Sequence, residues 1–111
     1  MATLDKYRYL IQQVLTEYTK IPYAYGQIQI ETIFDPTSDR YLLMIVGWNQ
    51  DKRIHGCLVH IDIINGKLWI QRDGTENGIA SELVAAGIPK EQIVLGFHPS
   101  EVRQHTEYAV T

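Results

Sequence analysis

Cysteine is nearly absent from this chain, which has only Cys57 among its 111 residues. A single cysteine excludes an intrachain disulfide and is typical of proteins of the reducing cytoplasm. The chain also lacks an apolar run of the roughly 18 residues that a membrane-spanning helix needs. Its first residues lack the apolar centre of a secretory signal. We therefore expect a cytoplasmic protein that has no contact with a membrane.

Basic residues are scarce relative to acidic ones, with 10 Lys and Arg against 13 Asp and Glu and a formal net charge of −3. They form no polybasic run, whereas strong non-specific binding to nucleic acid usually needs a surplus of Lys and Arg. Internal repeats and low-complexity linkers are missing too. The sequence therefore predicts a single domain that spans residues 1–111.

Apolar residues recur at helical spacing near the N-terminus and predict a helix from Leu4 to about Thr19. Its buried stripe consists of Leu4, Tyr7, Ile11, Val14, Leu15 and Tyr18. Pro22 predicts its end, because proline disfavours helical geometry in the preceding residue. We expect this helix to pack on a sheet.

Four strand-like segments follow, over about residues 27–34, 40–48, 53–64 and 67–71. Short polar turns separate them, and Asn65-Gly66 is the strongest hairpin signal because both residues tolerate the positive φ of a type I′ turn. The apolar run from Ile93 to Phe97 suits a brief fifth strand. The pattern predicts an α+β fold with an antiparallel meander sheet of four or five strands.

The C-terminal part predicts helical segments that pack on this sheet. A helix is expected from about Asn77 to Ala86, with Thr75 as its N-cap and Gly87 just after its end. A last helical turn or two is expected from Pro99 to about His105, with Arg103 facing water.

The two tight turns also predict a register. A two-residue Asn65-Gly66 loop places Ile63 opposite Leu68, Ile61 opposite Ile70, Asp62 opposite Trp69 and His60 opposite Gln71. A two-residue Gln50-Asp51 loop places Met44 opposite Cys57 and Leu42 opposite Val59. One face is then nearly pure aliphatic and should lie under the helices; it contains Ile28, Ile30, Leu42, Met44, Val46, Cys57, Val59, Ile61, Ile63, Leu68 and Ile70.

The opposite face is predicted to mix apolar and polar side chains. It contains Gln29, Glu31, Ile33, Tyr41, Leu43, Ile45, Leu58, His60, Asp62, Trp69 and Gln71. This mixture is too apolar for a freely solvated face, and contiguous exposed apolar surface usually marks an interface. Either the C-terminal tail or another protein chain is expected to cover it, and the two can coexist.

The loop from Arg72 to Glu76 combines a guanidinium, two carboxylates and a hydroxyl at an expected helix N-terminus, where an anion is favoured. It lacks the repeated glycines of a phosphate-binding loop, and its acids would repel phosphate. The pattern favours a strand-to-helix turn in which Gly74 supplies backbone freedom.

His60 and Asp62 fall on one strand face, a spacing that suits a metal site or a His–Asp pair. His98 and His105 would add ligands if the tail folds over that face. However, the histidines lack zinc spacing, and Cys57 is expected inside the aliphatic face, where a thiol is usually inert. We predict no catalytic residue, cofactor or metal.

Trp69, with Tyr41 and His60, has the composition of a base-stacking platform. Acidic residues in its middle favour a protein interface instead. The predicted interaction surface contains Tyr41, Leu43, His60, Asp62, Trp69, Arg72 and Asp73. Two alternatives stay open: a small-molecule or metal-binding enzyme that uses His60, Asp62, Arg72 and Asp73, and a direct nucleic-acid-binding module.

Several segments resemble one narrow family in order along the chain. They are Lys67–Glu76, Tyr41-Leu42 with Gly47-Trp48, His60–Ile63, Gly87–His98 and Thr106–Ala109. The chain resembles the fdxN element excision controlling factors of cyanobacteria (XisI-like proteins), and the likeness runs over nearly its whole length.

The resemblance implies a non-enzymatic accessory role in the programmed excision of a DNA element during heterocyst development. It implies action beside a recombinase and contact with a XisH-like partner that has a nuclease-like fold, so DNA is contacted only indirectly. The resemblance carries no catalytic residue over to this chain, and we expect no cofactor. A homodimer through the mixed sheet face is a further expectation.

Overall fold

The computed structural model describes residues 3–21 and 27–111. Pro22, the expected end of the first helix, lies outside them. The elements in chain order are α1 (Thr3–Tyr18), β1 (Gln27–Asp35), β2 (Arg40–Asn49), β3 (Lys52–Ile64), β4 (Lys67–Asp73), α2 (Ile79–Ala86), the 3₁₀ turn η1 (Lys90–Gln92), β5 (Ile93–Leu95) and α3 (Ser100–Arg103).

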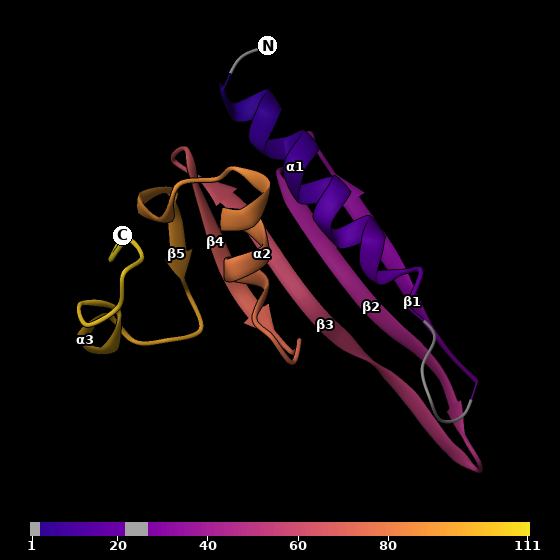
Figure 1. The fold of residues 1–111 in the computed structure, drawn as a ribbon. Helices are drawn as coiled ribbons and strands as arrows, with labels where there is room; N and C mark the ends of the chain where they lie inside the picture. Colours follow the sequence, from indigo (N-terminus) through magenta and orange to yellow (C-terminus); the bar gives the residue numbers. More distant parts are fainter. Residues whose placement is uncertain (1–2, 22–26) are drawn as a thin grey trace.

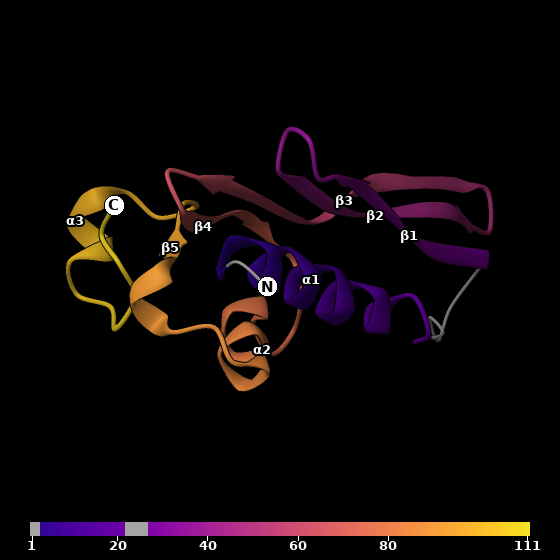
Figure 2. The same ribbon diagram turned by 90° about the horizontal axis from the view of Figure 1, so that it is seen from above.

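The strands form one sheet in the order β1-β2-β3-β4-β5, which confirms the α+β fold and the meander of the first four strands. The three-residue strand β5 runs parallel to β4. Helices α1 and α2 lie against the same face of the sheet, while α3 and the C-terminus lie beyond β5 (Figure 1, Figure 2). No helix in the described ranges has the length and apolar character needed to cross a membrane.

Helix α1 buries the predicted stripe. Tyr7, Ile11 and Leu15 are its buried residues, and they pack into the core together with residues of α2 and of β2 to β5. The helical spacing places these side chains on one side, so their burial holds α1 against the sheet.

Both tight turns form as predicted. Asn65 and Gly66 have φ angles of 50° and 80°, as a type I′ turn requires. Asn49 pairs with Lys52, so Gln50-Asp51 is also a two-residue loop. The predicted pairs Ile63–Leu68, Ile61–Ile70, Asp62–Trp69 and Met44–Cys57 are confirmed.

Two β-bulges then change the register further along the strands. In the β2–β3 ladder, Leu43 pairs with Val59 and Met44 with Cys57, so Leu58 is the extra residue. In the β3–β4 ladder, His60 pairs with Arg72, so Gln71 is the extra residue. The predicted pairs Leu42–Val59 and His60–Gln71 are wrong, because a turn determines the register only as far as the first bulge.

The bulge at Leu58 also reverses the predicted faces of β2. Tyr41 and Leu43 are both 0% exposed and belong to the core under the helices, so their predicted place on the outer face is wrong. Leu42, Met44 and Val46 alternate with them and therefore point to the outer face. Leu58, predicted outside, packs against the core.

Strands β1 and β2 approach each other closely at Gly47, which pairs with Ile28. A Cβ atom at Gly47 would lie 2.0 Å from the Gln27 carbonyl oxygen. Only glycine fits this contact, so Gly47 determines how tightly the edge strand β1 joins the sheet.

Candidate interaction surface

The outer face of β1 to β3 is uncovered in the part of the chain that the structure describes. Both long helices lie on the other side of the sheet, and α3 and the C-terminal segment lie near β5 (Figure 2). Alternation along the strands and the pairing of opposite residues place six apolar side chains on this face. We call them the outer strip: Ile33, Leu42, Met44, Val46, Trp48 and Cys57.

The outer strip is apolar and open to solvent at its ends. Ile33 and Trp48 are 51% and 48% exposed, and Leu42, Met44 and Val46 are half-buried between their neighbours. The Arg53 guanidinium lies 5.0 Å from the centre of the Trp48 ring. A contiguous apolar patch with a polar border is typical of a protein interface.

His60 and Asp62 form the predicted pair beside this strip. His60 Nε2 lies 2.8 Å from Asp62 Oδ1, and the Asp62 residue is only 7% exposed. Gln71 donates to Asp62 Oδ2 over 3.4 Å, and Arg40 Nη1 lies 3.6 Å from Asp62 Oδ1. Because these groups surround the carboxylate, Asp62 joins β2, β3 and β4 on the outer face.

Trp69 lies on the same face but is covered by the C-terminal tail. The Arg103 guanidinium stands 5.3 Å from the centre of a Trp69 ring and donates to the carbonyl oxygens of Val110 and His98 over 2.8 and 2.7 Å. The prediction that Arg103 faces water is therefore wrong. The tail covers the β4–β5 end of the outer face and leaves the outer strip open.

Cys57 lies on the outer face opposite Met44, not inside the helix-covered layer. Its thiol donates to the Val59 carbonyl oxygen over 3.3 Å. Burial raises the pKa of the Cys57 thiol, and the positive charge of Arg72 acts in the opposite direction. Arg72 itself is exposed, opposite His60.

Asp73 faces the helix layer, since it pairs with the buried Val59. Its carboxylate accepts from the Thr75 amide through Oδ1 and from the Ile79 amide through Oδ2, both over 2.9 Å. Helix α2 therefore begins at Ile79, and Gly78 is the residue before it. The prediction that Thr75 is the N-cap is wrong. Gly87 ends α2 with a φ of 117°, as expected.

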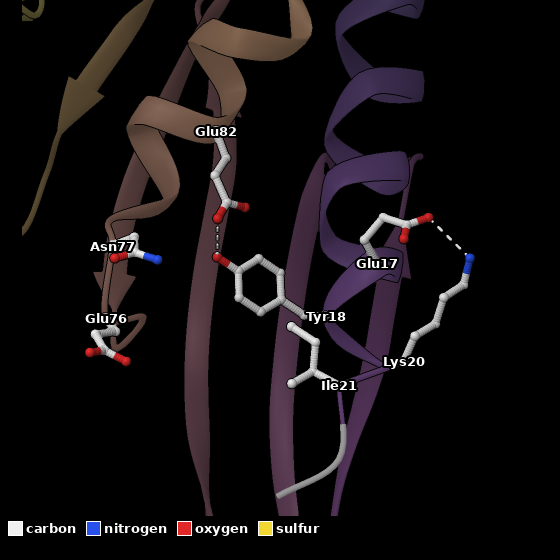
Figure 3. A pocket seen from close by; sticks show the side chains of 7 residues that line it. All are labelled: Glu17, Tyr18, Lys20, Ile21, Glu76, Asn77 and Glu82. Carbon is white, nitrogen blue, oxygen red and sulfur yellow. Dashed lines mark hydrogen bonds and ion pairs between the residues drawn. The ribbon is translucent and has the colours of Figure 1, made fainter.

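A cavity of about 480 Å³ lies at the end of α1 (Figure 3). It is lined by Glu17, Tyr18, Lys20, Ile21, Glu76, Asn77 and Glu82. Tyr18 donates a 2.7 Å hydrogen bond to Glu82 Oε1 and so joins α1 to α2. Burial, and then the Glu82 carboxylate, raise the pKa of the Tyr18 hydroxyl.

The structure brings together only some of the predicted site residues. His60, Asp62, Trp69 and Arg72 share the outer face, whereas Tyr41, Leu43 and Asp73 lie on the helix side. Within the described ranges, no group of three or more His, Cys, Asp or Glu side chains has an arrangement that could hold a metal ion.

Sequence reasoning missed Leu42, Met44 and Val46 as residues of the open face. The apolar run Cys57-Leu58-Val59 breaks the alternation of β3 and indicates an irregularity there, but it does not identify which residue lacks a partner. A register that is counted from the Gln50-Asp51 turn assumes unbroken pairing, so it is wrong beyond Cys57.

Comparisons with known proteins match this fold over nearly its full length. The family model for the XisI protein matches residues 1–110. The crystal structure of a XisI-like protein from Anabaena variabilis is 38% identical, with a TM-score of 0.88 over 98% of this chain and 100% of that chain. The structure of the fdxN element excision controlling factor XisI from the same organism is 34% identical, with a TM-score of 0.83 over 99% of this chain and 100% of that chain. No curated protein matches. The chain belongs to the XisI protein family.

Proposed function

We propose that this chain is a non-enzymatic accessory factor in programmed DNA excision and acts by binding a XisH-like, nuclease-fold partner in the cytoplasm. The similarity to a solved fdxN element excision controlling factor supports the process. The observation that carries the mode of action is the outer strip, an apolar surface on the sheet face that the long helices do not cover.

The charge of the chain supports a protein partner of this kind. Its net charge of −3 favours approach to the basic surface that a DNA-acting protein presents. Charges give the encounter its rate and orientation, whereas buried apolar side chains give the complex most of its lifetime. The outer strip supplies those apolar side chains. Its polar rim carries both signs of charge, with the Glu31 carboxylate opposite Met44 and the cations Arg40 and Arg72 near His60.

The geometry does not favour an enzyme built on His60, Asp62, Arg72 and Asp73. The Asp73 carboxylate is engaged with the start of α2 on the helix side of the sheet. His60 and Asp62 contact each other on the outer face, where Asp62 is nearly buried. A shared site would need all four groups to converge on one substrate.

Co-expression with a XisH-like protein tests the proposal. Wild type is expected to co-purify with the tagged partner. Met44→Lys should abolish the complex, because it places a charge in the outer strip. The new lysine lies opposite Glu31 of β1, which favours retention of the fold.

Gln13→Lys, on the exposed side of α1, is the matched control and should keep the complex. Circular dichroism should show that both variants are folded. The chain alone should not shift DNA in a mobility assay at any salt concentration. A wild-type pair that never co-purifies, or a Met44→Lys variant that binds as well as wild type, contradicts the proposal.

A further inference from the structure

The two edges of the sheet differ in whether another segment of the chain pairs with them. At the β5 edge, the Ala109 amide donates to the Ile93 carbonyl oxygen over 2.9 Å, and Val94 forms a parallel bridge with Ala109. The tail therefore pairs with this short edge strand. At the other edge, β1 is nine residues long and pairs with β2 alone among the described strands.

Strand β1 has few of the features by which proteins usually protect an exposed edge, and Glu31 is the one charged residue in its interior. Its sequence, Gln27 to Asp35, contains no proline, lysine or arginine. Its ladder with β2 runs through nine consecutive pairs without a bulge. A long, regular edge strand presents unpaired amide and carbonyl groups that are available to another strand.

The helix layer covers this edge only in part, since Ile30 and Phe34 pack against the core but the position between them does not. Thr32 pairs with the buried Leu43 and therefore faces the helix side, yet Thr32 is exposed. Ile33, on the outer face, is 51% exposed. Strand β1 is thus exposed on both sides at Thr32 and Ile33, and its free edge can receive a strand that extends the sheet.

From these observations we infer that β1 pairs antiparallel with β1 of a second copy of this chain, so that two five-stranded sheets form one continuous sheet. The chemistry of the strand selects a second copy. A two-fold axis at Ile30 places Gln29 opposite Glu31 of the other copy, and Ile28 opposite Thr32. The mid-strand carboxylate then meets a side-chain amide that can donate a hydrogen bond to it, twice per dimer.

Other two-fold registers are less favourable. An axis at Glu31 places two carboxylates opposite each other, which destabilises a strand pair. An axis at Thr32 places Glu31 opposite the apolar Ile33.

The two-fold axis at Ile30 keeps both outer faces on the same side of the joined sheet. The two outer strips then lie side by side, so the dimer presents both to partner proteins. The second copy uses the edge of β1 and leaves the strips free. Dimerisation is therefore independent of the proposed contact with a XisH-like protein.

Sedimentation velocity over a range of concentrations tests the inference. Wild type should approach twice the mass of the chain as concentration rises. Gln29→Glu should raise the dimer dissociation constant roughly three- to tenfold or more, because two like-charged pairs arise. Gln29→Lys should lower it. The double variant Gln29→Glu with Glu31→Gln exchanges the two partners and should restore wild-type dimerisation.

Gln13→Glu on α1 adds the same charge at an exposed site away from β1 and should have no effect. Hydrogen exchange should slow at amides of β1 in the dimer. A chain that stays monomeric at millimolar concentration overturns the inference. So does a dimer that Gln29→Glu leaves unchanged, or one that the double variant fails to restore.

Discussion

Arg8 and Asp39, which stand 31 positions apart in the sequence, form a two-bonded ion pair between α1 and the β1–β2 turn. Arg8 Nε and Nη2 donate to the two carboxylate oxygens over 2.7 and 3.1 Å. Tyr41 donates to the same carboxylate over 3.0 Å. The Asp39 backbone carbonyl accepts from the Ile63 amide over 3.1 Å. One residue thus holds α1, β2 and β3 together.

Asp39→Asn should lower the melting temperature by roughly 4 to 8 °C, equivalent to about 1 kcal/mol. The amide keeps the shape of the side chain but loses the charge that Arg8 and Tyr41 contact. Asp51→Asn, in the exposed Gln50-Asp51 turn, is the control. Thermal unfolding followed by circular dichroism measures the difference, and equal losses in both variants would contradict the role of the ion pair.

Asp39 should also make stability depend on pH on the acid side. The hydrogen bonds from Arg8, opposed by burial and aided by Tyr41, hold the pKa of the Asp39 carboxyl below its ordinary value. A depressed folded-state pKa contributes stability that is complete above the unfolded value of about 4 and is lost as pH falls through the folded value. From pH 6 down to about 4, the difference in unfolding free energy between wild type and Asp39→Asn should be constant. Below about pH 4, this difference should become smaller as Asp39 is protonated. A gap that persists at the lowest pH at which both variants fold would refute this assignment.

Gly47→Ala should destabilise the protein by roughly 1 to 3 kcal/mol, because the new methyl group overlaps the Gln27 carbonyl and pushes β1 away from β2. Gly56→Ala is the matched control. It lies in β3, where a Cβ atom would meet no atom within 4 Å. Urea unfolding should separate the two variants clearly, and similar midpoints would show that β1 tolerates displacement at this point.

Leu42→Ser and Leu43→Ser should differ strongly although the two residues are neighbours. Leu43 is 0% exposed under the helices, so its truncation and the buried hydroxyl should cost about 3 to 5 kcal/mol. Leu42 is half-buried on the outer face and should cost about 1 kcal/mol or less. Free energies of unfolding in urea measure both. The opposite ranking would mean that β2 has the register predicted without the bulge.

Arg103→Ala should loosen the C-terminal tail while the sheet stays folded. It removes the cation–π contact with Trp69 and the hydrogen bonds to Val110 and His98. We expect faster proteolysis after residue 96 and a shift in tryptophan fluorescence as Trp69 becomes wetter. Arg103→Lys keeps the charge but cannot donate to both the Val110 and His98 carbonyl oxygens as the guanidinium does, so it should restore the resistance to proteolysis only in part. Unchanged proteolysis in Arg103→Ala would show that the β5–tail pairing alone holds the segment.

Local chemistry determined much of this protein. The spacing of Tyr7, Ile11 and Leu15 determined α1 and its buried side, and Asn65-Gly66 determined the β3–β4 hairpin, because such signals act over a few residues. The family resemblance also needed the sequence alone, because it rests on short segments that occur in the same order along the chain. The pairing of His60 with Asp62 needed only that a strand alternates.

Tertiary structure alone decided which face of β2 is buried. The bulge at Leu58 places Tyr41 and Leu43 under the helices. Leu58 has no partner on β2, so Val59 pairs with Leu43 on the buried face while Cys57 pairs with Met44 on the outer face. Asp73 became a cap for α2 and Arg103 a cover for Trp69 for a similar reason. Each of these side chains contacts groups that only the folded chain brings close to it, so no local sequence pattern predicts the contact.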